Sequence, residues 1–331
     1  NYHRVVIQLL TLGISMTEKH QKFFSRKTYD KAYKSLNFLY QCLQEENGFL
    51  PNYGANDSAW FFPLSDTDYG DFRPQLNSLH RMLTGKYLYE NRNIKEEALW
   101  MGAENYIRKH YYSVLKKQRG ALEFPAGGYY IIREENTFTF IKCGKYKDRP
   151  SHADNLHIDI WHKGRNILCD GGSYKYNTEE KLVKYFSGTE SHNTVMLEDC
   201  SQMMKGPHFT WFNWTQALFA ELIENEEEYI FIGKVKCFTY LNNNIVHKRT
   251  IKKIKNQNIW CIRDEIIEKP SRMTMRQLWH VPEENICLYS KGNQYFVQQG
   301  CRSVCYGQKE EIKQVEYRTR SNVIETKISL I

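Results

Sequence analysis

Three short clusters of side chains in this sequence have the types and spacing that chemistry requires. The first, residues 1–4, reads Asn-Tyr-His-Arg at the head of a helical pattern. The second, residues 151–155, reads Ser-His-Ala-Asp-Asn and is followed at residues 170–174 by Asp-Gly-Gly-Ser-Tyr. The third, residues 191–195, reads Ser-His-Asn-Thr-Val. Phenol, imidazole and carboxylate groups transfer protons in catalysis, so these clusters are the candidates for an active site.

The first third of the chain has the apolar periodicity of helices. Gly13 is expected to break the first helix, and Asn47-Gly48 to end the second. The expected helices cover residues 2–12, 29–46, 74–88 and 94–115. Antiparallel helical hairpins are the natural interpretation of this pattern.

After about residue 121 the pattern changes to short strands separated by turns. The expected strands cover residues 129–132, 138–141, 156–161, 166–169, 194–197, 229–240, 245–254, 259–267, 274–280 and 295–298. Short strands between Gly, Asn, Asp or Pro turns predict a large antiparallel β-sandwich. With the boundary between residues 118 and 124, we expect a helical domain at 1–120 and a sandwich at 121–331.

Composition excludes several classes of protein. The 331 residues include 46 Lys and Arg against 38 Asp and Glu, a net charge of +8, but no basic block that predicts a nucleic-acid partner. No apolar run approaches the roughly 18 residues of a membrane span. Nine Cys without a C-x-x-C spacing predict buried thiols, not a disulfide framework. The 14% of aromatic residues suits stacking on sugar rings, or simply a β-rich domain.

The clusters also match a family pattern, roughly His-x-Asp-x-Leu-x-Phe, a turn, an apolar run, Asp-x-Gly-x-Tyr and later Ala-His-Asn-Thr. The matching residues are His152-Ala153-Asp154-Asn155-Leu156, Lys163-Gly164, Ile167-Leu168, Asp170-Gly171-Gly172-Ser173-Tyr174 and Ser191-His192-Asn193-Thr194, with Tyr2-His3 in the helical part. In these residues the chain resembles the heparinase II/III family of polysaccharide lyases. The resemblance implies the C-terminal part of an α/α toroid followed by a large antiparallel β-sandwich, with substrate between the two.

The implied reaction is β-elimination at a uronic acid. A base removes the C5 proton, the carboxylate is neutralised, and an acid protonates the leaving O4. Tyr2 matches the family's catalytic tyrosine, and His3 accompanies it as a catalytic candidate. The family's carboxylate-neutralising Asn or His is expected upstream of these residues. The family's second catalytic His falls on Pro150, so Tyr2 must act as acid and base or another His must substitute.

The resemblance further implies a metal site at His152, Asp170 and His192. Two imidazoles and a carboxylate suit Zn²⁺, whose expected role is structural, and no organic cofactor is implied. A hairpin centred near Gly164 would place Asp170 opposite residue 157 or 158, which makes His157 a rival ligand and requires His152 to lie on a segment that folds back. The alternative is that these histidines are hydrogen-bonded sandwich residues without a metal.

Five residues are assigned to the substrate. Tyr53 and Asn56 lie in a turn-rich loop that suits a sugar, and Arg73 suits a carboxylate. A loop in which Arg73 instead closes on a neighbouring Asp is equally consistent with the sequence. Asn155 and Tyr174 are assigned through the motif that contains them.

The sequence therefore predicts a lyase acting on a uronate-containing acidic polysaccharide such as a glycosaminoglycan. A uronate C5 epimerase of the same architecture is one alternative. A non-catalytic polysaccharide-binding or biosynthesis-associated protein is another, and Pro150 favours it. The expected location is the periplasm, where related degradative enzymes are often found, and nothing in the sequence indicates an oligomeric state.

Overall fold

The computed structural model describes residues 2–103, 112–283 and 285–331. The chain divides into two compact units. The first contains Asn1–Leu50 and Ser58–Gln118, and the second contains Pro51–Asp57 and Arg119–Ile331. No helix among the described residues is long and apolar enough to cross a membrane.

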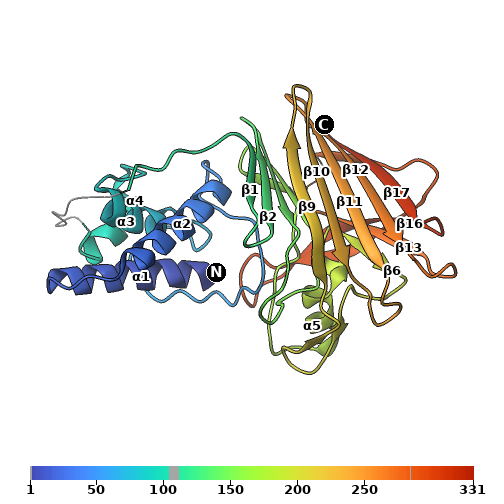
Figure 1. Cartoon of the computed structure of the whole chain (residues 1–331), viewed down its shortest axis with the longest axis horizontal. Coiled ribbons are helices and arrows are strands. Elements are labelled where there is room, and N and C mark those ends of the chain that lie inside the picture. The colour runs from blue at the N-terminus through green and yellow to red at the C-terminus, as the bar shows by residue number, and fades with distance from the viewer. Residues whose placement is uncertain (1, 104–111, 284) are drawn as a thin grey trace. The chain divides into compact units, whose positions relative to one another are not determined.

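The first unit is built from helices, as the apolar periodicity predicts. They are α1 (Tyr2–Lys19), α2 (Arg26–Cys42), α3 (Arg73–Thr84) and α4 (Arg92–Trp100). Helix α3 contacts each of the other three (Figure 1). The fully buried apolar side chains of these helices include Ile7, Ile14, Leu36, Leu39, Leu76 and Leu79. On α1 the buried face differs from the predicted stripe, because Val6 and Leu9 are exposed while Ile7 and Ile14 are buried. Burying each such side chain contributes about 1.5–3 kcal/mol, which offsets the modest intrinsic stability of short helices.

Four predicted helix ends are wrong. Helix α3 ends at Thr84 instead of residue 88, because Gly85 adopts a left-handed conformation that closes the helix. Helix α1 continues through Gly13 to Lys19, because the buried side chains of Thr11 and Ile14 pack on either side of the glycine and outweigh its cost of about 1 kcal/mol in a helix. Helix α2 ends at Cys42 instead of residue 46, because the next residue turns to an extended conformation. Helix α4 ends at Trp100, earlier than the predicted end at 115, and residues 104–111 of that prediction lie outside the described residues.

The second unit consists of antiparallel sheets, which confirms the predicted change from helices to antiparallel strands. The five-stranded sheet has the order β1 (Gly120–Phe124), β2 (Tyr129–Arg133), β3 (Thr137–Lys142), β4 (Ile158–His162) and β5 (Arg165–Leu168). The six-stranded sheet has the order β14 (Ile286–Tyr289), β17 (Val323–Leu330), β12 (Ile259–Ile267), β11 (Val246–Ile254), β10 (Glu228–Lys236) and β9 (Gln216–Glu224). The four-stranded sheet has the order β15 (Gln294–Arg302), β16 (Glu310–Thr319), β13 (Met275–Val281) and β6 (Val195–Leu197).

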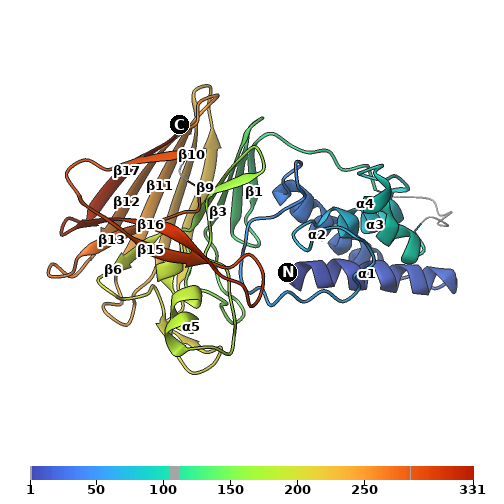
Figure 2. The same cartoon turned by 180° about the vertical axis from the view of Figure 1, so that it is seen from behind.

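One hydrophobic core holds these three sheets together. Along β10, β11 and β12 every second residue is buried, as expected for strands with one face in a core. Phe231 and Trp260 from the six-stranded sheet share this core with Ile158 of the five-stranded sheet and Trp279 of the four-stranded sheet. The six-stranded sheet is in front in Figure 1, and the four-stranded sheet is in front in Figure 2. The arrangement is a β-sandwich.

Connections at one end of the five-stranded sheet carry the clusters identified in the sequence. The β4–β5 hairpin turns at Lys163 and Gly164, both with positive φ, and pairs Ile160 with Leu168. Continuing this register places Asp170 beside residue 158, as the sequence predicts. Three further elements follow β5: α5 (Glu180–Ser187), the 3-10 turn η1 (Thr189–Ser191), and the small ribbon of β7 (Met204–Lys205) and β8 (Trp211–Phe212).

Residues 51–57, which the sequence analysis assigns to the helical domain, belong to the second unit. The ring of Tyr53 lies 5.3 Å from that of Tyr129 and 6.0 Å from that of Phe140. The backbone N–H of Asn56 donates to Oγ of Ser173 at 2.8 Å. These contacts, which join positions far apart in the sequence, hold the segment against the sandwich.

Candidate metal centre

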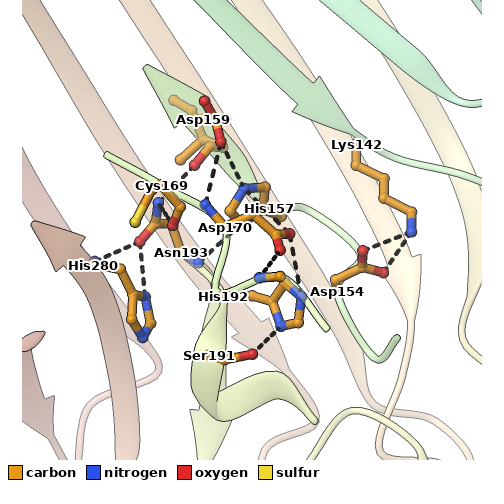
Figure 3. A network of polar contacts seen from close by, with 12 residues as sticks. Lys142, Asp154, His157, Asp159, Cys169, Asp170, Ser191, His192, Asn193 and His280 are labelled. Atoms are coloured by element: carbon orange, nitrogen blue, oxygen red, sulfur yellow. Dashed lines mark hydrogen bonds and ion pairs between the residues drawn. The ribbon is translucent and has the colours of Figure 1, made fainter. Parts of the chain in front are cut away.

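Four buried side chains converge at the end of the five-stranded sheet: His152, Asp154, Asp170 and His192. Each offers a ligand atom within 4.8 Å of those of the others. His152 and Asp154 lie in the connection between β3 and β4, Asp170 follows β5, and His192 follows η1. Figure 3 shows the carboxylate of Asp170 at the middle of this network, between the rings of His157 and His192. The structure therefore brings together the three residues that the resemblance implies as metal ligands, with Asp154 as a fourth.

Two glycines let the chain turn at Asp170. A Cβ on Gly171 would lie 2.6 Å from Cβ of Ser191, so only glycine lets the two segments approach this closely. The backbone N–H of Gly171 donates to Ser191 O at 2.9 Å. Gly172 has a φ of +77°, and a Cβ there would lie 2.1 Å from Ser303 O. The Asp-Gly-Gly sequence thus places the Asp170 carboxylate directly beside His192.

The contact between His192 and Asp170 has the dimensions of a shared cation site. Nδ1 of His192 donates to Gly188 O at 2.7 Å, which leaves Nε2 facing Oδ2 of Asp170 at 3.3 Å without hydrogen-bond geometry. In a tetrahedral site with bonds of about 2.0–2.2 Å, two ligand atoms lie roughly 3.3–3.6 Å apart. Burial alone would lower the pKa of His192, but its interactions with Asp170, together with those of Asp154 and Gly188 O, outweigh burial and raise the pKa, which favours a proton at this place when no metal is bound.

His152 offers an unused nitrogen to the same site. Its Nδ1 is buried and has no hydrogen-bond partner within the described part of the chain, while Nε2 lies 3.4 Å from Oγ of Ser173. Burial, followed by the positive charge of His192, lowers the pKa of His152 to about 4. The ring is therefore neutral at physiological pH. A neutral buried imidazole with an open lone pair is the form in which histidine binds metals.

His157, the rival ligand, is held in a different role. Its Nδ1 accepts a hydrogen bond from the backbone N–H of Asn193 at 3.0 Å, so the neutral ring carries its proton on Nε2. This Nε2 lies 3.8 Å from Oδ2 of Asp159 and 3.9 Å from Oδ2 of Asp170. A protonated nitrogen cannot bind a metal, so His157 is suited to orient the Asp170 carboxylate.

Lys142 neutralises the fourth carboxylate. Its Nζ lies 2.6 and 2.7 Å from the two carboxylate oxygens of Asp154, and the hydroxyl of Tyr146 donates to Oδ1 at 3.0 Å. Burial would raise the pKa of Asp154, but the charges of Lys142, His192 and His152 together lower it below its usual value. Asp170 is therefore the carboxylate left for a metal. Sequence reasoning missed Lys142, although a lysine ending the apolar run of β3 is an unusual signal of a buried charge pair.

The catalytic candidates lie in the first unit, on α1. Tyr2 is half-exposed. Nε2 of His3 hydrogen-bonds with Oγ of Ser35, and its ring stacks on Phe38 with 5.8 Å between centroids. Burial lowers the pKa of His3 to about 4, so the ring is neutral. The guanidinium of Arg4 is buried among three aromatic rings.

Two of the five substrate candidates have other contacts. Arg73 forms a bidentate pair with Asp71, with distances of 2.8–3.1 Å, which is the closed loop left open by the sequence. Asn155 is wholly buried, and its amide bonds with Gly144 and Thr215. The prediction that Asn155 contacts the substrate is therefore wrong. Its buried amide instead braces the loop that carries the candidate ligands.

The other three substrate candidates are partly exposed on the second unit: Tyr53, Asn56 and Tyr174. Tyr174 has a φ of 53° and packs on Phe186 with 5.4 Å between ring centroids. The left-handed backbone at Tyr174 changes the direction of the chain four residues after Asp170.

The chain is similar to a known protein family and to several solved structures. Residues 116–323 match the family described as Heparinase II/III-like, C-terminal. No curated protein sequence matches the chain. A solved structure of heparinase III with methylated lysines matches with a TM-score of 0.72 at 16% identity, over 100% of this chain and 50% of that one. The heparan sulfate lyase HepC from Pedobacter heparinus matches with a TM-score of 0.72 at 14% identity, over 99% and 51% of the two chains.

A chondroitin AC lyase from Streptomyces coelicolor A3 matches with a TM-score of 0.50 at 7% identity, over 92% of this chain and 49% of that one. The chain thus spans about half the length of the solved structures that it matches, and at these identities the similarity shows a shared fold. The family match covers well over half of the chain. The chain therefore belongs to the heparinase II/III-like family.

Proposed function

We propose that the protein is a polysaccharide lyase that cleaves a uronate-containing acidic polysaccharide by β-elimination. The observation that carries this proposal is the family match over residues 116–323. The shared fold with lyases of heparan sulfate and chondroitin supports a glycosaminoglycan-like polymer as the substrate. Sequence identities near 15% leave the particular polymer to experiment.

The reaction requires one proton to leave C5 and one to reach O4. Removal of the C5 proton forms the C4–C5 double bond as the C4–O4 bond breaks, and the departing oxygen takes a proton. We assign both transfers to Tyr2, because Pro150 stands where the family pattern has its second histidine. As a phenolate the side chain accepts the C5 proton, and it then donates that proton to O4. The ring of His3 is neutral, so it adds no charge beside Tyr2. Its hydrogen bond with Ser35 fixes the start of α1.

We also propose that His152, Asp170 and His192 bind Zn²⁺, with water completing the site. The support is the 3.3 Å separation of Nε2 and Oδ2 together with the unused Nδ1 of His152. When bound, the ion would supply structural cross-linking. These three residues would join the β3–β4 connection, the end of β5 and the start of β6.

The remaining assignments are part of the same proposal. Residues 1–120, without the segment 51–57, would belong to an α/α toroid, and residues 121–331 would form the sandwich domain. The paired helices of the first unit and the shared fold support this division. A periplasmic location would be tested by fractionating cells that produce the protein.

The test of the lyase is direct. The protein is incubated with heparan sulfate, chondroitin sulfate, hyaluronan and alginate, and the ultraviolet absorbance of the unsaturated product is followed. We expect absorbance to rise with at least one polymer. Tyr2→Phe should abolish the rise, and Tyr289→Phe, which changes another exposed tyrosine, should leave it intact. A folded protein that produces no absorbance with any polymer would contradict the proposal.

A non-catalytic polysaccharide-binding protein is the second candidate, and Pro150 favours it. This proline is buried, and its side chain neither donates nor accepts a proton. Binding of a polymer without cleavage and without hydrogen exchange at C5 would support this function. Exchange at C5 without cleavage would instead indicate a uronate epimerase.

A further inference from the structure

Loops beside the candidate metal centre carry a group of aromatic and cationic side chains. We call this group the aromatic–basic surface and define it as Arg149, Lys175, Tyr176, Phe209, Tyr306 and Lys309. Arg149 lies three residues before His152 in the sequence, and Lys175 follows the turn after Asp170. Neither the family pattern nor the metal centre assigns any role to these six residues.

Three aromatic rings from separate loops form a ridge. The ring of Tyr176 lies 5.2 Å from that of Phe209 and 5.4 Å from that of Tyr306, both edge-to-face. The backbone N–H of Tyr176 donates to the hydroxyl of Tyr306 at 3.1 Å. Gly307 N–H donates to Tyr174 O at 2.9 Å, so the loops are fixed to one another. Phe209 leaves 49% of its surface in water, so the ridge ends in an exposed ring.

Three cations lie close to aromatic rings of these loops, one at the ridge itself and two at Tyr174. The Arg149 guanidinium lies 4.8 Å from the centre of the Phe209 ring. Nζ of Lys175 lies 5.4 Å, and that of Lys309 6.0 Å, from the centre of the Tyr174 ring. In the part of the chain that the structure describes, none of the three cations pairs with a carboxylate, whereas cations on the six-stranded sheet do so repeatedly. Among the described residues, these three positive charges are therefore left unpaired for an anionic ligand.

We propose that the aromatic–basic surface binds an acidic polysaccharide. The apolar faces of sugar rings pack on the aromatic ridge, and carboxylate or sulfate groups pair with Arg149, Lys175 and Lys309. The proposal rests on the proposed function, because it takes the polymer of that reaction as the ligand. It goes further by assigning recognition of the polymer's anionic groups to this surface of the second unit. Single-stranded nucleic acid also combines rings with anionic groups, and the test below includes it.

The test removes the three charges together. The triple variant R149Q/K175Q/K309Q is compared with R272Q/K291Q/R320Q, which removes the same charge from exposed positions elsewhere on the second unit. Affinity for immobilised heparan sulfate and hyaluronan is measured at several salt concentrations. We expect the first variant to bind at least about tenfold more weakly, with a shallower salt dependence. The control should stay within about threefold of the wild type.

The variant Phe209→Ala tests the contribution of the aromatic ridge to binding separately from that of the three charges. We expect it to weaken binding while leaving the salt dependence unchanged, because no charge is lost. Unchanged binding in the charge variant would overturn the proposal, as would an equal loss in the control or tighter binding of single-stranded DNA than of either polymer. Thermal unfolding confirms that each variant is folded.

Product absorbance measured on the same proteins separates this proposal from the lyase reaction. Weaker binding by the charge variant, with no cleavage by the wild type, would support the surface and contradict the lyase. Cleavage with unchanged affinity and KM in the charge variant would support the lyase and overturn the surface.

Discussion

The geometry of the candidate metal centre predicts a graded loss of Zn²⁺ affinity when its residues are changed. In His192→Ala the nitrogen that faces Asp170 at 3.3 Å is removed, and a buried carboxylate is left without its partner. In His157→Phe the candidate ligands remain, but the Nε2–H group 3.9 Å from Asp170 is lost. In His162→Ala, on β4, neither the ligands nor their supports are touched.

The magnitudes follow from these contacts. Groups that orient a ligand typically contribute 10–100-fold to metal affinity, so His157→Phe should weaken Zn²⁺ binding by about that factor. His192→Ala removes a ligand itself and should exceed about 100-fold. His162→Ala should bind as the wild type does. At a free Zn²⁺ concentration about 100 times the Kd, the wild type should gain about 2.7 kcal/mol in unfolding free energy.

Competition with a chromophoric chelator measures these affinities, and thermal unfolding measures the stabilisation. We expect one Zn²⁺ per chain, with the largest loss of affinity in His192→Ala, a smaller loss in His157→Phe and none in His162→Ala. This result would support the assignment of the His157 proton to Nε2. If His157→Phe loses as much affinity as His192→Ala, then His157 is itself a ligand and the reasoning from its Nδ1 contact is refuted. Stoichiometric binding in all three variants would place the metal elsewhere.

Three further predictions concern the same region. The raised pKa of His192 means that a proton competes with the metal, so Zn²⁺ affinity should fall as the pH is lowered from about 8 to about 6, as titrations at each pH would show. Lys142→Met should lower the unfolding free energy in urea by about 3–5 kcal/mol, and adding Asp154→Leu should restore most of it. Gly172→Ala should cost at least about 2 kcal/mol more in the same assay than Gly292→Ala, which has a similar φ but open space around it.

The parts of the fold that could be predicted depend on local periodicity. Alternating burial along β10–β12 follows from the period of two, and the pairing of His162 with Arg165 in the β4–β5 hairpin follows from a two-residue turn. The shift of register between Ile160 and Trp161 has no such local signal. Helix ends were predicted less well. A glycine at position 13 favours a helix end, but the burial of Thr11 and Ile14 on either side of it, which no local pattern reveals, keeps α1 continuous.

The details of the site depend on contacts between distant residues. The family pattern groups His152, Asp170 and His192 as ligands, but it does not decide whether His157 is a ligand in place of one of them. That distinction comes from the backbone N–H of Asn193, which lies 36 residues away and sets the tautomer. No spacing rule predicts such a bond, because it requires η1 and β4 to be placed by the whole sandwich.

The charge balance of the buried cluster leads to a last prediction. Lys142 neutralises Asp154, and the raised pKa of His192 favours a proton that balances Asp170 when no metal is bound. Zn²⁺ in place of that proton adds one positive charge. Asp159 is the remaining buried carboxylate beside His157, and burial raises its pKa, so ionisation of Asp159 would offset the added charge.

Metal binding and ionisation of Asp159 should therefore be coupled. As the pH is lowered toward the raised pKa of Asp159, we expect the number of protons released per Zn²⁺ bound to exceed one. Calorimetry in buffers of different protonation enthalpy counts these protons. Asp159→Asn should reduce the number to one or fewer, because only His192 then loses a proton. Equal proton release by the wild type and this variant would show that Asp159 keeps one charge state, and the proposed balance would fail.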